Sequence, residues 1–180
     1  VQKLSEWQKQ GKNELYISVN ISAKDFYYMD VYKTITTLVE KYGIIPKTLK
    51  LEITETAIMT GISGELEILE QFRNYGFQVE IDDFGSGYSS LNTLKDMDVD
   101  VLKIDMGFLR TTKSDRIQRS MSILNNIIDL SKTLGLSVIT EGVETKEQVT
   151  ALTKMGCRIY QGYYFSKPIP IEEFENTYLK

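Results

Sequence analysis

The chain has 180 residues, 42% of them hydrophobic and 26% charged, which suits one globular domain with a hydrophobic core. Histidine is absent, so Ser-His-Asp and Cys-His catalysis are excluded and an imidazole zinc site is disfavoured. The net charge of −4 argues against binding a nucleic acid polymer, and no apolar run approaches the roughly 20 residues of a membrane helix, so no membrane contact is expected.

Strand-like and helix-like segments alternate along the chain. Strands are expected over 15–20, 49–54, 77–83, 101–105, 136–141 and 157–161. Helices are expected over about 1–10, after the first strand up to Lys41, over 65–74 and 115–134, from a capping box at Thr145 and Gln148, and over 171–179. The 115–134 helix should bury Ile117, Met121, Leu124 and Ile128. The alternation predicts βαβ units and a mainly parallel α/β sheet.

The strand pattern favours a closed barrel over an open doubly wound sheet. In the strand 49–54, leucine and isoleucine face one side, while Lys50, Glu52 and Thr54 face the other; Glu80 and Asp82 do the same in the third strand. A complete (β/α)8 barrel has eight strands and about 250 residues. Because only six strands are predicted, and the chain starts without methionine, we expect a TIM barrel that is incomplete here, lacking N-terminal strand(s).

Polar residues end almost every predicted strand. In a barrel, the carboxyl ends of the strands form the active site, so these side chains should converge. Carboxylates gathered in this way repel one another unless cations lie between them, and oxygen ligands favour Mg²⁺ or Mn²⁺. The pattern predicts a metal-dependent hydrolase site built from Asn20, Glu52, Asp82, Asp83, Lys103, Glu141 and Gln161.

The densest motif runs from Asp82 to Ser90. Neighbouring strand residues point to opposite faces, so both aspartates reach one centre only if the strand ends and turns at Phe84-Gly85. The spacing Gly85-Ser86-Gly87 is a weak phosphate-loop signal, and an acidic turn is the simpler alternative.

The other motifs also have simpler interpretations when each is taken alone. Glu52 and Glu55 could be a solvated strand end, and Lys103 a surface residue. Glu141 and Glu144 could favour the N-terminus of the next helix. Gln161 and the aromatic residues 163–165 could form core packing or a wall on which bases stack. Their shared placement at strand ends is what indicates a site.

Taken together, the motifs resemble the EAL domain of bacterial cyclic-di-GMP phosphodiesterases, in order and across essentially all 180 residues. The matching strings are Val19-Asn20-Ile21-Ser22, Glu52-Ile53-Thr54-Glu55, Asp82 to Ser90, Lys103-Ile104-Asp105, Glu141-Gly142-Val143-Glu144-Thr145 and Gln161-Gly162. The resemblance implies a modified TIM barrel that hydrolyses cyclic di-GMP to linear pGpG with two Mg²⁺ or Mn²⁺ ions.

The resemblance also implies roles for single residues. Asn20, Glu52 and Asp82 would be metal ligands, Asp83 would hold the second ion, and Glu141 would help directly or through water. Lys103 would orient or deprotonate the attacking water, and Gln161 would steady that water or the metal shell. Glu55 would fix the loop that contains Gly85, Ser86 and Gly87, Glu144 would have a structural role in its turn, and Asp105 and Tyr163 would contact substrate.

Two departures from the family pattern matter. The Glu-Ala-Leu tripeptide, whose glutamate is a metal ligand in the family, does not occur, and Met106-Gly107 replaces the usual Arg-Ser before Phe108. We therefore expect residues 1–180 to be a partial EAL domain that is impaired alone, within a parent protein that is a phosphodiesterase. The alternatives are an inactive receptor module that binds cyclic di-GMP and a purely interactive domain.

Two further expectations concern the surroundings of the domain. The single cysteine, Cys157, excludes an internal disulfide, should be a small buried residue, and fits a reducing cytoplasm. The resemblance implies a homodimer for the complete domain, whereas an incomplete barrel with an open edge should self-associate.

Overall fold

The computed structural model describes residues 1–59, 65–86, 94, 97–110 and 114–179. Six strands form one sheet in the order β1-β2-β3-β4-β5-β6, and each neighbouring pair is parallel. The strands are β1 Ile17–Ile21, β2 Leu49–Thr54, β3 Gln78–Phe84, β4 Val101–Ile104, β5 Ser137–Thr140 and β6 Ile159–Tyr160. The predicted parallel α/β architecture is confirmed.

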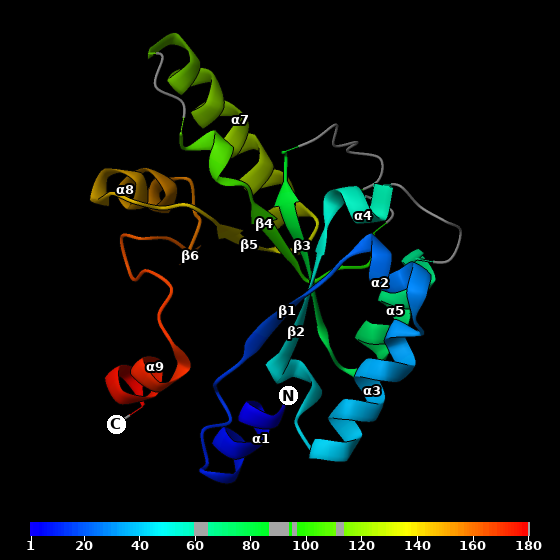
Figure 1. The fold of residues 1–180 in the computed structure, drawn as a ribbon. Coiled ribbons are helices and arrows are strands. Elements are labelled where there is room, and N and C mark those ends of the chain that lie inside the picture. Colours follow the sequence, from blue (N-terminus) through cyan, green and yellow to red (C-terminus); the bar gives the residue numbers. More distant parts are fainter. Residues whose placement is uncertain (60–64, 87–93, 95–96, 111–113, 180) are drawn as a thin grey trace.

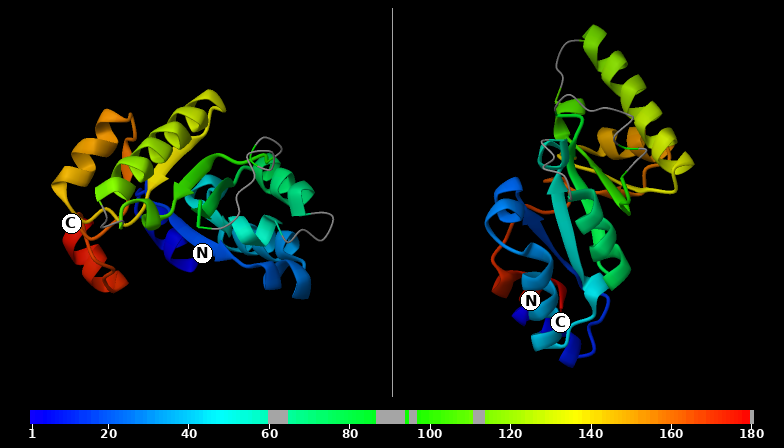
Figure 2. Two further views of the ribbon diagram at one scale, coloured as in Figure 1. Left: turned by 90° about the horizontal axis from the view of Figure 1, so that it is seen from above. Right: turned by 90° about the vertical axis from the view of Figure 1, so that its right-hand side faces the viewer.

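Helices connect the strands and lie around the sheet (Figures 1 and 2). They are α1 Gln2–Lys9, α2 Ala23–Tyr28, α3 Val31–Tyr42, α4 Glu55–Met59, α5 Glu65–Tyr75, α7 Ser114–Thr133, α8 Lys146–Lys154 and α9 Ile171–Tyr178, with short 3-10 helices η1 Pro46–Thr48 and η2 Met106–Phe108. The predicted capping box of α8 is present: Thr145 accepts from the Gln148 N–H, and Gln148 accepts from the Thr145 N–H. In the described ranges, no helix is long and apolar enough to cross a membrane.

The two faces of the sheet differ, as the strand pattern predicts. Leu51, Val79 and Ile81 are fully buried on the outer face and belong to a continuous apolar core beneath the helices. The alternate residues, such as Glu52 and Asp82, point to the inner face. Strands β1 and β6 are the edges of the sheet, and no described residues pair one with the other. This arrangement fits an incomplete barrel.

One core prediction is wrong. Leu124 and Ile128 of α7 are buried, but Ile117 is 43% exposed. The N-terminal end of α7 projects past the strands, so its first turns have no sheet to pack against (Figure 1). The hydrophobic period identified the buried face of the helix, but not how far the sheet extends beneath it.

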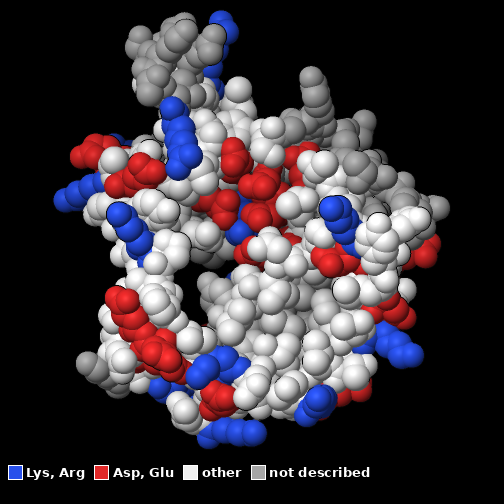
Figure 3. All heavy atoms as spheres, in the orientation of Figure 1, with Lys and Arg blue, Asp and Glu red and all other residues white. Residues whose placement is uncertain are grey.

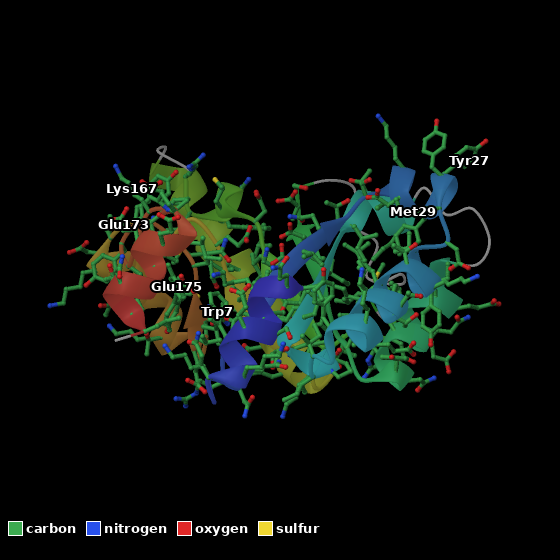
Figure 4. All side chains as sticks on the ribbon, turned by 60° about the horizontal axis from the view of Figure 1, so that its bottom comes forward. Trp7, Tyr27, Met29, Lys167, Glu173 and Glu175 are labelled. Carbon is green, nitrogen blue, oxygen red and sulfur yellow. The ribbon has the colours of Figure 1, made fainter. Side chains whose placement is uncertain are left out.

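The first and last helices meet. The Trp7 indole N–H donates to Glu175 Oε1 at 2.7 Å, and Lys12 Nζ donates to the Leu179 carbonyl at 2.6 Å. Figure 4 shows Trp7 and Glu175 close together between α1 and α9, whereas Tyr27 projects from the far side of the molecule. The C-terminal helix is therefore held against the start of the chain.

Candidate active site

The carboxyl ends of the six strands bring the predicted polar residues to one edge of the sheet. Asn20 lies on β1, Glu52 on β2, Asp82 and Asp83 on β3 and Lys103 on β4, while Glu141 follows β5 and Gln161 follows β6. Asn20 and Glu52 are register partners, so they lie side by side. Acidic side chains gather around a basic one near the middle of this face (Figure 3).

Lys103 is the centre of the cluster. Its Nζ lies 2.7 Å from Asp82 Oδ1, 2.9 Å from Glu141 Oε1 and 3.0 Å from Glu52 Oε1. Only 3% of Lys103 is exposed, so it is not the surface residue that a lone strand lysine suggests. One buried ammonium group thus links the ends of β2, β3, β4 and β5.

The charge on Lys103 is secured by its neighbours. Burial alone lowers the pKa of Lys103, but hydrogen bonds to Asp82, Glu141 and Glu52 outweigh burial and raise the pKa above its ordinary value. The ammonium group therefore keeps its proton at neutral pH. This favours orienting a reactant or neutralising its charge over removing a proton from water.

A β-bulge brings both aspartates to the site. The pairing of β3 with β4 shifts between Ile81 and Phe84, and Asp83 has a φ of 56°, in the left-handed region that aspartate adopts more readily than most residues. The strand continues to Phe84, one residue beyond the predicted end, and the turn predicted at Phe84-Gly85 follows at Gly85. The extra bulge residue, rather than a strand end, turns the second carboxylate toward the first.

Three carboxylates are close enough to share a cation. Oxygens of Asp82, Asp83 and Glu141 all lie within 4.8 Å of one another. Burial, and then the charge of Asp82, raise the pKa of Asp83; burial also raises the pKa of Glu141, against the opposing effect of Lys103. Crowded, partly desolvated carboxylates of this kind are stabilised by a divalent ion, so the donor set fits a divalent metal that takes oxygen ligands.

The loop after β3 is tied to the start of α4. The Gly85 N–H donates to Oε2 of Glu55, which is 6% exposed. A Cβ atom on Gly85, where φ is +89°, would lie 2.5 Å from the Phe108 ring, so only glycine fits without a shift. The Ser86 N–H donates to the Asp83 carbonyl, and Gly87 lies outside the described residues. Glu55 thus contacts the loop as the resemblance implies.

A cavity of about 350 Å³ opens beside Glu141. Gln161 and Tyr163 line it, together with Glu144 and Met106. Arg110 Nη2 lies 3.5 Å from Glu144 Oε1, and Lys167 Nζ lies 5.6 Å from the centre of the Tyr163 ring. The cavity therefore offers cationic, aromatic and amide groups next to the carboxylates, which suits a ligand with phosphates and aromatic bases.

Two predicted residues make other contacts in the structure, and a third lies at the surface. Asn20 is exposed. The Asp105 Oδ1 accepts from the Gly107 N–H at 2.7 Å and caps η2. The backbone N–H of Glu144 donates to Gln148 at 2.7 Å. Metal binding by Asn20 and substrate binding by Asp105 therefore remain predictions.

Sequence reasoning missed Arg110 and Lys167, both of which line the cavity. Each follows a strand by several residues, so strand position gives no signal for either. The sequence offers one weak signal that these residues line the cavity: each is a basic residue that follows a strand-end motif by a few positions.

The parallel sheet, and the carboxylates and buried lysine at its carboxyl edge, define an α/β domain of the TIM-barrel type with a candidate metal centre. The chain belongs to the EAL domain family, whose model matches residues 1–168.

Individual relatives agree with this assignment. "Cyclic di-GMP phosphodiesterase NbdA" of Pseudomonas aeruginosa is 37% identical over 171 residues, 93% of this chain and 22% of that protein. The solved structure "PaMucR Phosphodiesterase, c-di-GMP complex" matches with a TM-score of 0.87 and 35% identity, over 96% of this chain and 69% of the other. A manganese/cy-diGMP complex of Klebsiella pneumoniae BlrP1 matches with a TM-score of 0.79 and 27% identity, over 92% of this chain and 42% of the other. The chain spans about a fifth of the curated relative's length.

Proposed function

We propose that this domain hydrolyses cyclic di-GMP to linear pGpG as a metal-dependent phosphodiesterase. The observation that carries the proposal is the buried Lys103 held by three carboxylates from different strands, beside a cavity with aromatic and basic walls. The relatives support the choice of substrate, because NbdA is named a cyclic di-GMP phosphodiesterase and MucR was solved with c-di-GMP.

The residues of this chain divide the work. Asp82, Asp83 and Glu141 form the closest carboxylate group, and Glu52 reaches the same lysine, so these four residues, with Asn20, would hold divalent ions. Bound Mg²⁺ or Mn²⁺ would supply positive charge to the attacking and leaving oxygens of the phosphodiester. Lys103, fixed as a cation, stabilises charge that develops on the phosphate oxygens and orients the attacking water.

The cavity would hold the nucleotide. Tyr163 can stack on a guanine base, while Arg110 and Lys167 can meet the phosphate that is not being cleaved. Gln161 lines the same cavity as Glu141 and would position water by hydrogen bonding. We further propose a cytoplasmic location, since Cys157 is a free buried thiol, and a homodimer as the working state.

The test is turnover of cyclic di-GMP by the intact protein with Mn²⁺, with products separated by chromatography. Linear pGpG from the wild type, and a loss of about 10²-fold or more in a Glu52→Gln variant, is the expected result. A Glu67→Gln variant on the exposed side of α5 is the matched control and should retain activity. Tight binding of cyclic di-GMP without product would contradict the proposal and assign the domain to the receptor class.

A further inference from the structure

A second ion pair lies on the inner face of the sheet, and none of the roles above uses it. Lys50 Nζ is 3.0 Å from Glu80 Oε1, and the two side chains are 12% and 1% exposed. The same ammonium group lies over the Tyr16 ring, 3.7 Å from its centre. Burial of two opposite charges carries a desolvation cost that the attraction between them often does not repay.

The pair is also imperfectly satisfied. Among the described residues, Glu80 Oε1 is a buried side-chain oxygen without an aligned hydrogen bond, although its ion-pair partner is close. An apolar side chain would fill this position at lower cost. The charge of Glu80 is therefore poorly explained by stability alone, and its position relative to the site becomes the relevant question.

The pair lies beside and below residues of the candidate active site. Glu80 is the register partner of Glu52 on the neighbouring strand, and such strands are about 4.8 Å apart. Glu80 precedes Asp82 by two residues, and Lys50 precedes Glu52 by two, so all four side chains share the inner face. Lys50 thus lies one step below Glu52, whereas Glu80 lies beside Glu52 and one step below Asp82.

The charge of Glu80 acts on two residues of the site. It repels the Glu52 carboxylate beside it, and it attracts the Lys103 ammonium group, which lies two residues beyond Val101, the register partner of Glu80. Burial raises the pKa of Glu80, and the ammonium group of Lys50, 3.0 Å away, opposes this and favours the ionised carboxylate. The contacts of Lys103 with Glu52, Asp82 and Glu141 all come from residues of the site.

We propose that Lys50 and Glu80 are positioning residues whose ion pair keeps Glu52 and Lys103 at the carboxyl edge of the sheet, in place for a divalent ion and substrate. This inference rests on the proposed function for its kinetic consequences. Its consequence for metal binding is independent of that function.

The first test is Glu80→Gln in the intact protein, with Mn²⁺ affinity measured by titration calorimetry and with kinetics on cyclic di-GMP. Loss of a supporting charge beside a metal site should weaken Mn²⁺ binding and lower kcat by about tenfold each, with little change in KM. A Glu80→Gln protein that is folded, with wild-type Mn²⁺ affinity and kcat, would overturn the proposal.

The exchanged pair separates positioning from stability. In Lys50→Glu/Glu80→Lys the ion pair is kept, so thermal stability should return toward that of the wild type. A positive charge now lies beside Lys103 and Glu52, so Mn²⁺ affinity and kcat should stay low. If thermal stability, Mn²⁺ affinity and kcat all returned to wild-type values, the ion pair would have only a structural role. If either variant fails to fold, Lys50→Met/Glu80→Gln has no unpaired buried charge and should show the same tenfold losses.

The matched control is Asp100→Asn. Asp100 accepts from the Val79 N–H and pairs with Arg73 at 3.1 Å, so it supports the same strands from the end away from the site. Its loss should lower stability and leave Mn²⁺ affinity unchanged; an equal fall in affinity would mean that any weakening of the sheet mimics Glu80→Gln, against the proposal. A wild type that binds Mn²⁺ but does not cleave cyclic di-GMP would refute the proposed function alone.

Discussion

The two faces of the sheet are formed by the same strands, but their buried side chains have different kinds of partner. On the outer face, Leu51 and Val79 are fully buried in aliphatic packing that any helix with a complementary surface could cover. On the inner face, Glu52 and Lys103 are nearly as buried, but each is satisfied only by particular charged partners. The outer face therefore determines that the sheet forms, and the inner face determines what it can bind.

This comparison predicts that substitutions on the two faces impair different properties of the protein. An outer-face change should reduce stability while the site remains competent in the molecules that stay folded. An inner-face change should abolish binding or chemistry in a protein that still folds.

The largest effect is expected on the inner face, for Lys103→Met. Removal of the cation that joins Glu52, Asp82 and Glu141 should reduce turnover of cyclic di-GMP by about 10²–10³-fold. Mn²⁺ should raise the thermal stability of this variant more than that of the wild type, because a divalent ion replaces the lost charge. Lys132→Met is the control: Lys132 is exposed on α7 and donates to the Met155 carbonyl away from the site, so this variant should keep wild-type turnover. If the Lys103→Met variant kept wild-type turnover, Lys103 would have no role in the reaction.

The next largest effect is expected on the outer face, for Leu51→Ala. Leu51 is adjacent to Glu52 in sequence but fully buried on the opposite side. The cavity left behind should lower the free energy of unfolding by about 2–5 kcal/mol, measured by urea denaturation. Mn²⁺ affinity of the folded fraction should not change. A parallel loss of affinity would show that the two faces are not separable.

A smaller effect is expected where the loop meets the site, for Gly85→Ala. The new methyl group would meet the Phe108 ring at a φ that L-residues rarely adopt, at a cost of about 1–3 kcal/mol. The Gly85 N–H contact with Glu55 should weaken, and Mn²⁺ affinity should fall with it. Gly135 has a similar φ, but a Cβ atom added there would have nothing within 4 Å. The Gly135→Ala variant therefore measures the cost of the backbone conformation without a contact such as that with Phe108.

The smallest effect is expected at the junction of α1 and α9. The Trp7 indole N–H holds the pKa of Glu175 below its ordinary value, and burial opposes this only in part. Because the pKa of Glu175 is lower in the folded protein, the contact stabilises the fold fully at pH values above the ordinary glutamate pKa. This stabilisation is lost as the pH falls through the lowered pKa of Glu175. Fluorescence of the single tryptophan should report this acid transition.

Glu173 is the control for this junction, because it lies on the same helix but is exposed (Figure 4). Glu175→Gln should abolish the acid transition in tryptophan fluorescence, whereas Glu173→Gln should leave it in place. An unchanged transition in Glu175→Gln would mean that another group reports the pH.

Much of the fold could be predicted because periodicity reports burial directly. The alternation in β2 identified both faces, and the carboxyl-end rule for barrels placed Glu52 and Lys103 together before any coordinates. The bulge at Asp83 could not be predicted, since it depends on how β3 pairs with β4 rather than on the residues of β3 alone. The exposure of Ile117 likewise depends on where the sheet ends beneath α7.

The site was easier to locate than to complete. Asp82 lies near the carboxyl end of β3 and Glu141 directly follows β5, so strand position alone identified them. Lys50 and Glu80 were recognised as inward-facing residues, but their pairing requires the register of β2 against β3. Arg110 and Lys167 reach the cavity from irregular segments, whose paths local sequence patterns do not determine.

The arrangement of the cluster also has a consequence for synthesis of the chain. Glu52, Asp82, Lys103 and Glu141 emerge from the ribosome in that order, and translation proceeds at roughly 5–20 residues per second. The two carboxylates that appear first must wait for the ammonium group that neutralises them, and the third carboxylate follows only after α7 is made. The proposed cation site can therefore be complete only late in biogenesis, after β5 and Glu141 have been made.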